Sequence, residues 1–244
     1  MSARGIFASD FHMFCERSVV DSILPDLDRA AQDVDIIILG GDIVDFKWTQ
    51  LEDYETTETA ALTWLRSFIN RHSGKQIVYL VGNHDGPPSY LSQLHQMCDS
   101  TERFEVYEYW YQRGEFLFLH GDAIHGRSTQ AELERCRAKK TRHRKRGRVK
   151  NELYNLAFLL RLPSLVNVLI NRDRPVCQRL VRYLQDEKLV PGRGLRRIYF
   201  GHTHAVVKGF RLDELEFYNG GAPLRTLSSV ILHFEIDGDF CDGK

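Results

Sequence analysis

The chain has 244 residues, enough for one large domain or for a domain with a sizeable insertion, and its composition is that of an ordinary globular protein. Thirty-three basic residues balance thirty-three acidic ones, which excludes attraction of the whole molecule to nucleic acid or membrane and leaves only local clusters of charge. No basic segment precedes a long apolar run at the N-terminus, and the five cysteines are scattered without a C-x-x-C pair. We therefore expect a cytoplasmic protein with reduced thiols and without a signal peptide or spanning helix.

Short apolar runs that end in polar, glycine-rich turns predict buried strands. These runs lie in residues 5–12, 34–45, 76–85, 115–122 and 196–204. Between the first three, residues 19–32 and 57–72 have helical character, and Ser18 followed by Asp21 predicts a cap for the first helix. Strands alternating with helices in this way predict an α/β protein with parallel central strands.

Closely spaced strands are predicted in the second half of the chain. Residues 104–120 and 205–222, with residues 230–236 following, have the pattern of antiparallel hairpins.

Residues about 127–190 interrupt this pattern because they contain no strand-like run. We expect a helical cap inserted into a single domain that spans residues 1–244. Thr129 and Glu132 give a capping signal near its start, and ten Lys or Arg follow between Arg135 and Lys150. The second part, residues 151–172, is strongly apolar. One interpretation is a solvated basic face followed by a helix buried against the core, and the other is a lid over a site.

Polar residues that follow the predicted strands are the candidates for chemistry, because the carboxyl ends of strands in an α/β sheet meet in one crevice. Five of the ten histidines and three oxygen-bearing side chains lie there. They are Asp10, His12, Asp42, Asn83, His84, His120, His202 and His204. Each group alone is also typical of a turn or a cap, but together they predict a dinuclear metal centre.

Five motifs carry a resemblance to a known family. They are D-x-H at 10–12, G-D-x-x-D at 41–45, G-N-H-D at 82–85, H-G-D at 120–122 and G-H-T-H at 201–204. In this order they resemble the calcineurin-like metallophosphoesterase superfamily, and they span nearly the whole chain. The resemblance implies an α/β (α+β) fold, a four-layer αββα sandwich of two mixed sheets. It implies that one metal is held by Asp10, His12, Asp42 and His204, and the other by Asp42, Asn83, His120 and His202, with Asp42 bridging.

Mixed carboxylate and imidazole ligands suit Mn²⁺, Fe²⁺ or Zn²⁺ better than Ca²⁺ or Mg²⁺. We therefore expect two divalent ions, with Mn²⁺ as the first choice. Two ions roughly 3.5 to 4 Å apart activate a water and clamp phosphate oxygens during in-line displacement, without a covalent enzyme intermediate.

The superfamily resemblance also implies catalytic roles. Asp42 bridges, Asn83 supplies a neutral oxygen, and His84 faces the substrate as transition-state stabiliser or general acid, oriented by Asp85. For Asp45 and Asp122, a hydrogen bond to a ligand and a turn cap both remain open, and the role of His125 is also open. The histidines without motif context, His72, His95, His143 and His233, are expected to be surface or core residues.

The cap is expected to decide the substrate. Its Lys and Arg suit phosphates or the head groups of an anionic membrane, and its apolar part suits acyl chains. The candidate substrate contacts are Asn83, His84, Arg135, Lys139 and Lys140. Residues 158–171 and the "GDIVDFKW" turn at 41–48 resemble the UDP-2,3-diacylglucosamine hydrolase family of lipid A synthesis. That resemblance implies hydrolysis of a nucleotide-linked lipid to the lipid 1-phosphate and UMP, at the inner membrane face. Members of that family commonly have G-N-R-D where this chain has G-N-H-D, so His84 stands in place of the arginine.

Two alternatives come from other classes. The basic run from Arg135 to Lys150 is also compatible with a phosphodiesterase or nuclease for a non-lipid nucleotide or nucleic acid. It lacks the interleaved aromatic residues that stack on single-stranded bases, so a nucleic-acid partner is not expected. A binding scaffold that has lost its metals is disfavoured because every ligand position is filled. The oligomeric state stays open.

Overall fold

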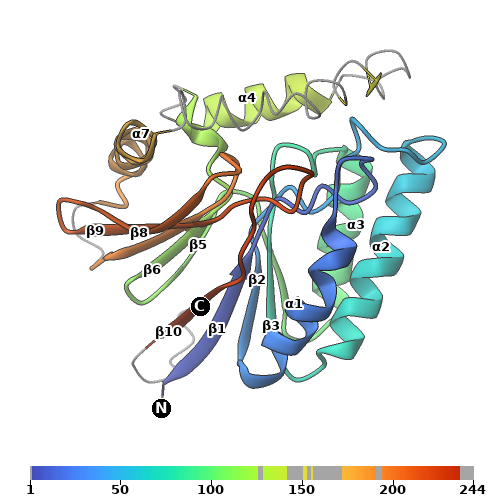
Figure 1. Cartoon of the computed structure of the whole chain (residues 1–244), viewed down its shortest axis with the longest axis horizontal. Helices are drawn as coiled ribbons and strands as arrows, with labels where there is room; N and C mark the ends of the chain where they lie inside the picture. The colour runs from blue at the N-terminus through green and yellow to red at the C-terminus, as the bar shows by residue number, and fades with distance from the viewer. Residues whose placement is uncertain are drawn as a thin grey trace.

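Two mixed five-stranded sheets form the centre of the computed structural model, which describes residues 2–125, 129–141, 151–152, 155, 172–190 and 194–236 (Figure 1). The first sheet has the order β10 (Leu232–Ile236), β1 (Ala3–Ala8), β2 (Ile36–Leu39), β3 (Gln76–Leu80) and β4 (Phe104–Tyr107). The second has the order β5 (Trp110–Arg113), β6 (Phe116–Leu119), β7 (Arg197–Phe200), β9 (Leu215–Gly220) and β8 (Val206–Leu212).

Helices cover the outer faces of both sheets. Side chains from three of them pack on the first sheet: α1 (Leu24–Ala30), α2 (Tyr54–Arg71) and α3 (Pro88–Ser100). On the second sheet lie α7 (Asp173–Asp186) and the short 3₁₀ helix η3 (Asp122–Ile124). Two further 3₁₀ helices, η1 (Val20–Ser22) and η2 (Ala31–Asp33), flank α1. The expected four-layer αββα sandwich is thus confirmed.

Alternation along β2 shows why the strands are apolar on both faces. Ile37 and Leu39 pack toward the helices, whereas Ile36 and Ile38 pack in the cluster between the two sheets. Strands that are buried on both faces carry continuous runs of Ile, Leu and Val, as this one does. The same inter-sheet cluster contains many aromatic rings, among them Phe7, Phe118, Tyr199 and Phe234.

Parallel pairing brings the ends of the central strands together. β1, β2, β3 and β4 are parallel neighbours, and so are β6, β7 and β9. Beyond β1 and β2 the backbones stay paired, with Asp10 N donating to Gly41 O and His12 N to Asp42 O, both at 2.9 Å. Beyond β6 and β7, Gly201 N donates to His120 O at 2.9 Å. The polar motifs that follow these strands therefore begin at the same end of the sandwich.

Some sequence expectations were wrong in detail. Ser18 does not cap α1, which begins at Leu24 without a side-chain cap. The Ser18 hydroxyl instead donates to Phe11 O and accepts from Val20 N. Only β5 and β6, and β8 and β9, form the expected hairpins. β4 instead pairs parallel with β3, and β10 returns to pair antiparallel with β1, because both strands bury apolar side chains within the first sheet.

Helix α3 was not expected, although the sequence carries a signal for it. Pro88 occupies the first turn, and the buried residues Tyr90, Leu94 and Met97 recur at helical spacing. The helix connects β3 to β4 and completes the cover of the first sheet.

Of residues 127–190, the segment expected to form a helical cap, the described part includes α4 (Gln130–Thr141), which lies across the end of the molecule toward which β1 runs (Figure 1). The expected capping signal is partly confirmed, because Glu132 N donates to Thr129 Oγ1 at 3.3 Å. Residues 142–150 and the apolar stretch 156–171 lie outside the described residues. None of the helices that the structure describes is long and apolar enough to cross a bilayer.

Candidate metal centre

Loops that follow five strands bring the sequence-derived candidates together at one end of the sandwich. Among the residues that the structure describes, three groups of side chains have ligand atoms within 4.8 Å of one another. The groups are Asp10, His12 and His204; His12, Asp42 and His84; and Asp42, His120 and His202. The structure thus places seven of the eight candidates in overlapping clusters, and Asn83 contacts the same Asp42.

Asp42 lies at the junction of these groups. Its Oδ2 atom is 3.3 Å from His120 Nε2 and 3.9 Å from His12 Nε2, and it accepts a hydrogen bond from Asn83 Nδ2 at 3.4 Å. Its Oδ1 accepts from the backbone N of His84 at 2.7 Å. A carboxylate in contact with both sides of the site is the arrangement that a bridging ligand requires.

The other side is built around Asp10. His204 Nε2 is 3.4 Å from Asp10 Oδ1 and 3.1 Å from His12 Nε2. The Asp10 carboxylate also accepts from His202 N at 2.9 Å and from Ser9 Oγ at 2.6 Å. These two donors fix the carboxylate while its oxygen faces the imidazoles.

Two buried atoms indicate that a cation belongs here. Asn83 Oδ1 is buried and makes no hydrogen bond to the residues that the structure describes, and buried His120 Nε2 faces the Asp42 carboxylate at 3.3 Å. Such atoms are costly to bury unless they bind something. Burial disfavours the charged form of His120, yet the Asp42 carboxylate raises its pKa to about 10. Carboxylate, amide and imidazole donors converging on one point fit a borderline divalent ion.

Backbone strain is concentrated in the same loops. Five residues of the site have positive φ angles in the left-handed region: Asp10 (57°), His12 (46°), Asp42 (51°), His202 (67°) and His204 (57°). Each non-glycine residue there costs on the order of 1–2 kcal/mol. Strain of this kind persists where the surrounding fold holds it in place, commonly at functional sites.

Gly82 allows a close approach that no other residue would permit. A Cβ at this position would lie 2.2 Å from Asp42 Oδ1 and 2.3 Å from Asp42 N. We expect Gly82→Ala to displace Asp42 and to lower kcat/KM for a phosphodiester by roughly 10- to 100-fold. Gly74→Ala is the contrasting control, because Gly74 has a φ of +115° but nothing within 4 Å of its added Cβ. It should lower the thermal midpoint and leave kcat/KM unchanged, and full activity of Gly82→Ala would contradict the expectation.

Asp45 holds two of the imidazoles. Its Oδ2 accepts from His12 Nδ1 at 3.2 Å and its Oδ1 from His84 Nδ1 at 3.1 Å. Burial alone would raise the pKa of Asp45, but His84 and His12 hold it far below the usual range. Asp45 is therefore an ionised carboxylate that fixes the rings of His12 and His84.

The hydrogen bonds of the Asp85 carboxylate do not support the expectation that it orients His84. The carboxylate instead accepts from the backbone N of Asp42 (2.7 Å), Val44 (2.9 Å) and Gly82 (2.9 Å). Tyr79 donates its hydroxyl to the same carboxylate at 3.0 Å. Burial, with the Asp42 carboxylate, raises the pKa of Asp85 to about 6. Asp85 thus anchors the strained loop that carries Asp42, and no sequence motif pointed to Tyr79.

The remaining candidates divide by position. His125 lies at the site, with its Nε2 2.8 Å from His202 Nε2. His72 pairs with Asp28 and His95 with Glu108, both on the helical side of the first sheet. His233 lies in β10, and His143 lies outside the described residues.

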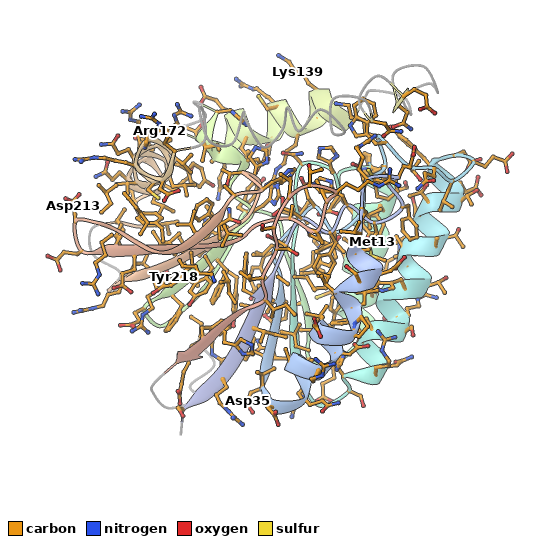
Figure 2. The ribbon with its side chains drawn as sticks, in the orientation of Figure 1. Met13, Asp35, Lys139, Arg172, Asp213 and Tyr218 are labelled. Carbon is orange, nitrogen blue, oxygen red and sulfur yellow. The ribbon has the colours of Figure 1, made fainter. Side chains whose placement is uncertain are left out.

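The basic residues of α4 are not all alike. Arg135 and Lys139 are exposed, and Figure 2 shows the Lys139 side chain pointing away from the sheets. The side chain of Lys140 lies outside the described part of the chain. Arg137, which the sequence did not single out, instead forms an ion pair with Asp122. Burial would raise the pKa of Asp122, but Arg137 holds it well below the usual range.

Comparison with one solved structure supports the fold. A dimetal phosphatase from Danio rerio aligns with a TM-score of 0.51 and 12% identity over 95% of this chain and 91% of its own. A phosphoesterase from E. coli, Yfce, aligns with a TM-score of 0.42 and 13% identity over 97% and 89%. The nuclease MPE from Pseudomonas putida gives a TM-score of 0.33 and 21% identity over about half of each chain, 48% and 53%. A search of curated proteins found no match.

A family model decides the assignment. The model described as calcineurin-like phosphoesterase matches residues 4–206, which include all five motifs and the metal-site loops. The chain belongs to the calcineurin-like phosphoesterase family, whose members are metallophosphoesterases.

Proposed function

We propose that this phosphoesterase binds two divalent ions bridged by Asp42 and hydrolyses the pyrophosphate of a nucleotide-linked lipid. The position of Asp42 carries the dinuclear part of the proposal. Asp42 belongs to a cluster with His12 on one side and to a cluster with His120 and His202 on the other. Asp10, His12 and His204 would complete one coordination sphere, and Asn83, His120 and His202 the other.

The protein residues around this centre fit phosphoester hydrolysis. When bound, the two ions stabilise charge on phosphate oxygens and lower the pKa of a water, with Mn²⁺ as our first choice. Asp45 accepts a hydrogen bond from the Nδ1 atom of His84 at 3.1 Å and so fixes the ring. His84, whose side chain is 20% exposed, would then donate its Nε2 proton to the leaving oxygen.

The substrate proposal depends on the cap and on the two resemblances to UDP-2,3-diacylglucosamine hydrolases in the sequence. Arg135 and Lys139 present positive charge on the exposed face of α4. Charges of this kind would meet phosphates or the anionic head groups that surround a lipid substrate, from the inner face of the membrane. Asn83, His84 and the Lys140 side chain are the other proposed contacts.

The test is Mn²⁺-dependent hydrolysis of UDP-2,3-diacylglucosamine in detergent micelles, measured beside bis(p-nitrophenyl) phosphate and a single-stranded oligonucleotide. We expect kcat/KM for the glycolipid to exceed that for the generic diester by roughly 10³-fold or more, because remote binding energy is used in the transition state. Release of UMP and a lipid 1-phosphate identifies the bond cleaved.

Turnover of the diester without the glycolipid would overturn the lipid substrate and keep the metallophosphoesterase. Efficient, salt-sensitive cleavage of the oligonucleotide would favour the nuclease alternative. Reconstitution of the metal-free protein with Mn²⁺, Fe²⁺ or Zn²⁺ separately, with metal content measured for each, tests the proposed metal.

A further inference from the structure

We propose that Arg137 is a positioning residue that fixes cap helix α4 against the metal centre through Asp122. This inference rests on the proposed function, because it concerns how the cap is held over the same site. It assigns a role to one residue of the basic run that differs from the roles of its neighbours.

The contact between Arg137 and Asp122 is bidentate and buried. Arg137 Nε donates to Asp122 Oδ2 at 2.9 Å, and Nη2 donates to Oδ1 at 2.8 Å. The two side chains are only 12% and 1% exposed. A planar guanidinium that meets a carboxylate through two parallel hydrogen bonds fixes orientation as well as distance, which a lysine cannot do.

Asp122 connects this contact to the metal site. It follows His120 by two residues and begins η3, whose residues Ala123 and Ile124 are buried in the core of the second sheet. The carboxylate that receives Arg137 is therefore attached to a rigid part of the catalytic domain. A helix that docks there is held at a fixed distance from His120.

Further contacts fix the direction of α4. Arg137 Nη1 also donates to Glu108 O, and Tyr109 donates its hydroxyl to Glu134. Glu108 and Tyr109 lie in the connection between β4 and β5, where the chain passes from one sheet to the other. At the start of the helix, Gln130 N donates to Glu187 Oε1 at 2.9 Å, just beyond α7. α4 is thus attached at its first turn and near its middle.

Because α4 is a regular helix, fixing Arg137 also fixes the directions of the neighbouring charged side chains. Residues two positions apart on a helix lie about 200° apart around its axis. Because Arg137 points into the domain, Arg135 and Lys139 are directed outward, and both are exposed. Arg137 is therefore expected to place the charges proposed for substrate or membrane contact without touching the substrate itself.

Steady-state kinetics of Arg137→Gln on two substrates tests the role. With UDP-2,3-diacylglucosamine we expect KM to rise about tenfold or more with a smaller change in kcat, whereas kcat/KM for bis(p-nitrophenyl) phosphate should stay within about twofold. Arg137→Lys should recover part of the glycolipid KM. Arg182→Gln, which removes an exposed arginine from α7, is the matched control and should match the wild type on both substrates.

A double variant distinguishes two causes of a raised KM, a displaced cap helix and a buried Asp122 carboxylate without its arginine partner. Loss of Arg137 alone leaves the Asp122 carboxylate buried and unpaired by this arginine, which is costly. Asp122→Asn with Arg137→Gln removes both charges, and we expect its glycolipid KM to remain raised. Recovery of the wild-type KM in the double variant, or an equal loss on both substrates in Arg137→Gln, would overturn the positioning role.

Hydrogen exchange gives a measurement that does not depend on the substrate. Amide protection within residues 130–139 should fall by about tenfold or more in Arg137→Gln and stay unchanged in Arg182→Gln. Unchanged protection in Arg137→Gln would also overturn the role. If the wild type cleaves only the diester, the lipid substrate fails, and hydrogen exchange still decides whether Arg137 fixes α4.

Discussion

Asp42→Ala is expected to lower kcat/KM for any phosphoester substrate by about 10⁴-fold or more, because both metal subsites lose the ligand that they share. No neighbouring side chain can replace it. Asp10 already belongs to the cluster with His12 and His204, and Asp45 and Asp85 are engaged with imidazoles and with backbone N–H groups. Metal analysis should find two bound ions per wild-type chain and at most one in the variant.

Folding of the variant has to be controlled. Asp42 has a φ of 51°, which alanine adopts poorly, so some loss of stability is expected from the backbone alone. Asp42→Asn keeps the side-chain volume and tolerates this φ, and it removes only the charge. Asp33→Ala removes an exposed aspartate from η2 and should behave as wild type. If Asp42→Asn binds two ions and keeps more than about a tenth of the activity, the bridging role is wrong.

Much of the fold and the site could be predicted because both depend on short-range patterns. Runs such as Ile36–Leu39 are long enough only for a strand, and each is followed within a few residues by a polar motif. Parallel pairing then requires that these ends lie side by side. The clusters around Asp10 and Asp42 follow from that geometry.

The strand partners could not be predicted in the same way. β4 and β5 are separated by two residues, Glu108 and Tyr109, yet they belong to different sheets. β10 follows a hairpin but crosses to β1. Such choices depend on which apolar faces become buried together, and a local pattern does not contain that information.

The contacts that hold the site side chains in place could also not be predicted from the sequence. Asp45 and Asp85 are both carboxylates in motifs, and spacing alone did not show which one contacts His84. Three-dimensional proximity decides it, since Asp45 Oδ1 lies 3.1 Å from His84 Nδ1 and Asp85 is turned toward backbone amides. Likewise, Arg137 is one of ten basic residues in its run, and only its packing distinguishes it.

His84→Ala is expected to lower kcat by about 10²- to 10⁴-fold while the protein still binds both ions. The geometry allows a second role for this residue, because His84 lies close enough to His12 and Asp42 to share a metal with them. We favour proton donation, since Asp45 accepts from the Nδ1 atom of His84 and the ring is partly exposed to an incoming substrate. Asn83 provides the oxygen ligand from the same loop in this assignment.

The dependence of rate on the leaving group distinguishes the two roles of His84. A proton donor matters most when the leaving oxygen is a poor one, so log kcat for His84→Ala across a series of aryl phosphodiesters should fall more steeply with leaving-group pKa than in the wild type. His95→Ala removes a histidine that pairs with Glu108 on the helical side and should reproduce the wild-type slope. If His84→Ala loses a metal ion and keeps the wild-type slope once metal is restored, His84 is a ligand. Its Asp45 partner would then act by orienting a metal-binding imidazole, the role that we propose for it at His12.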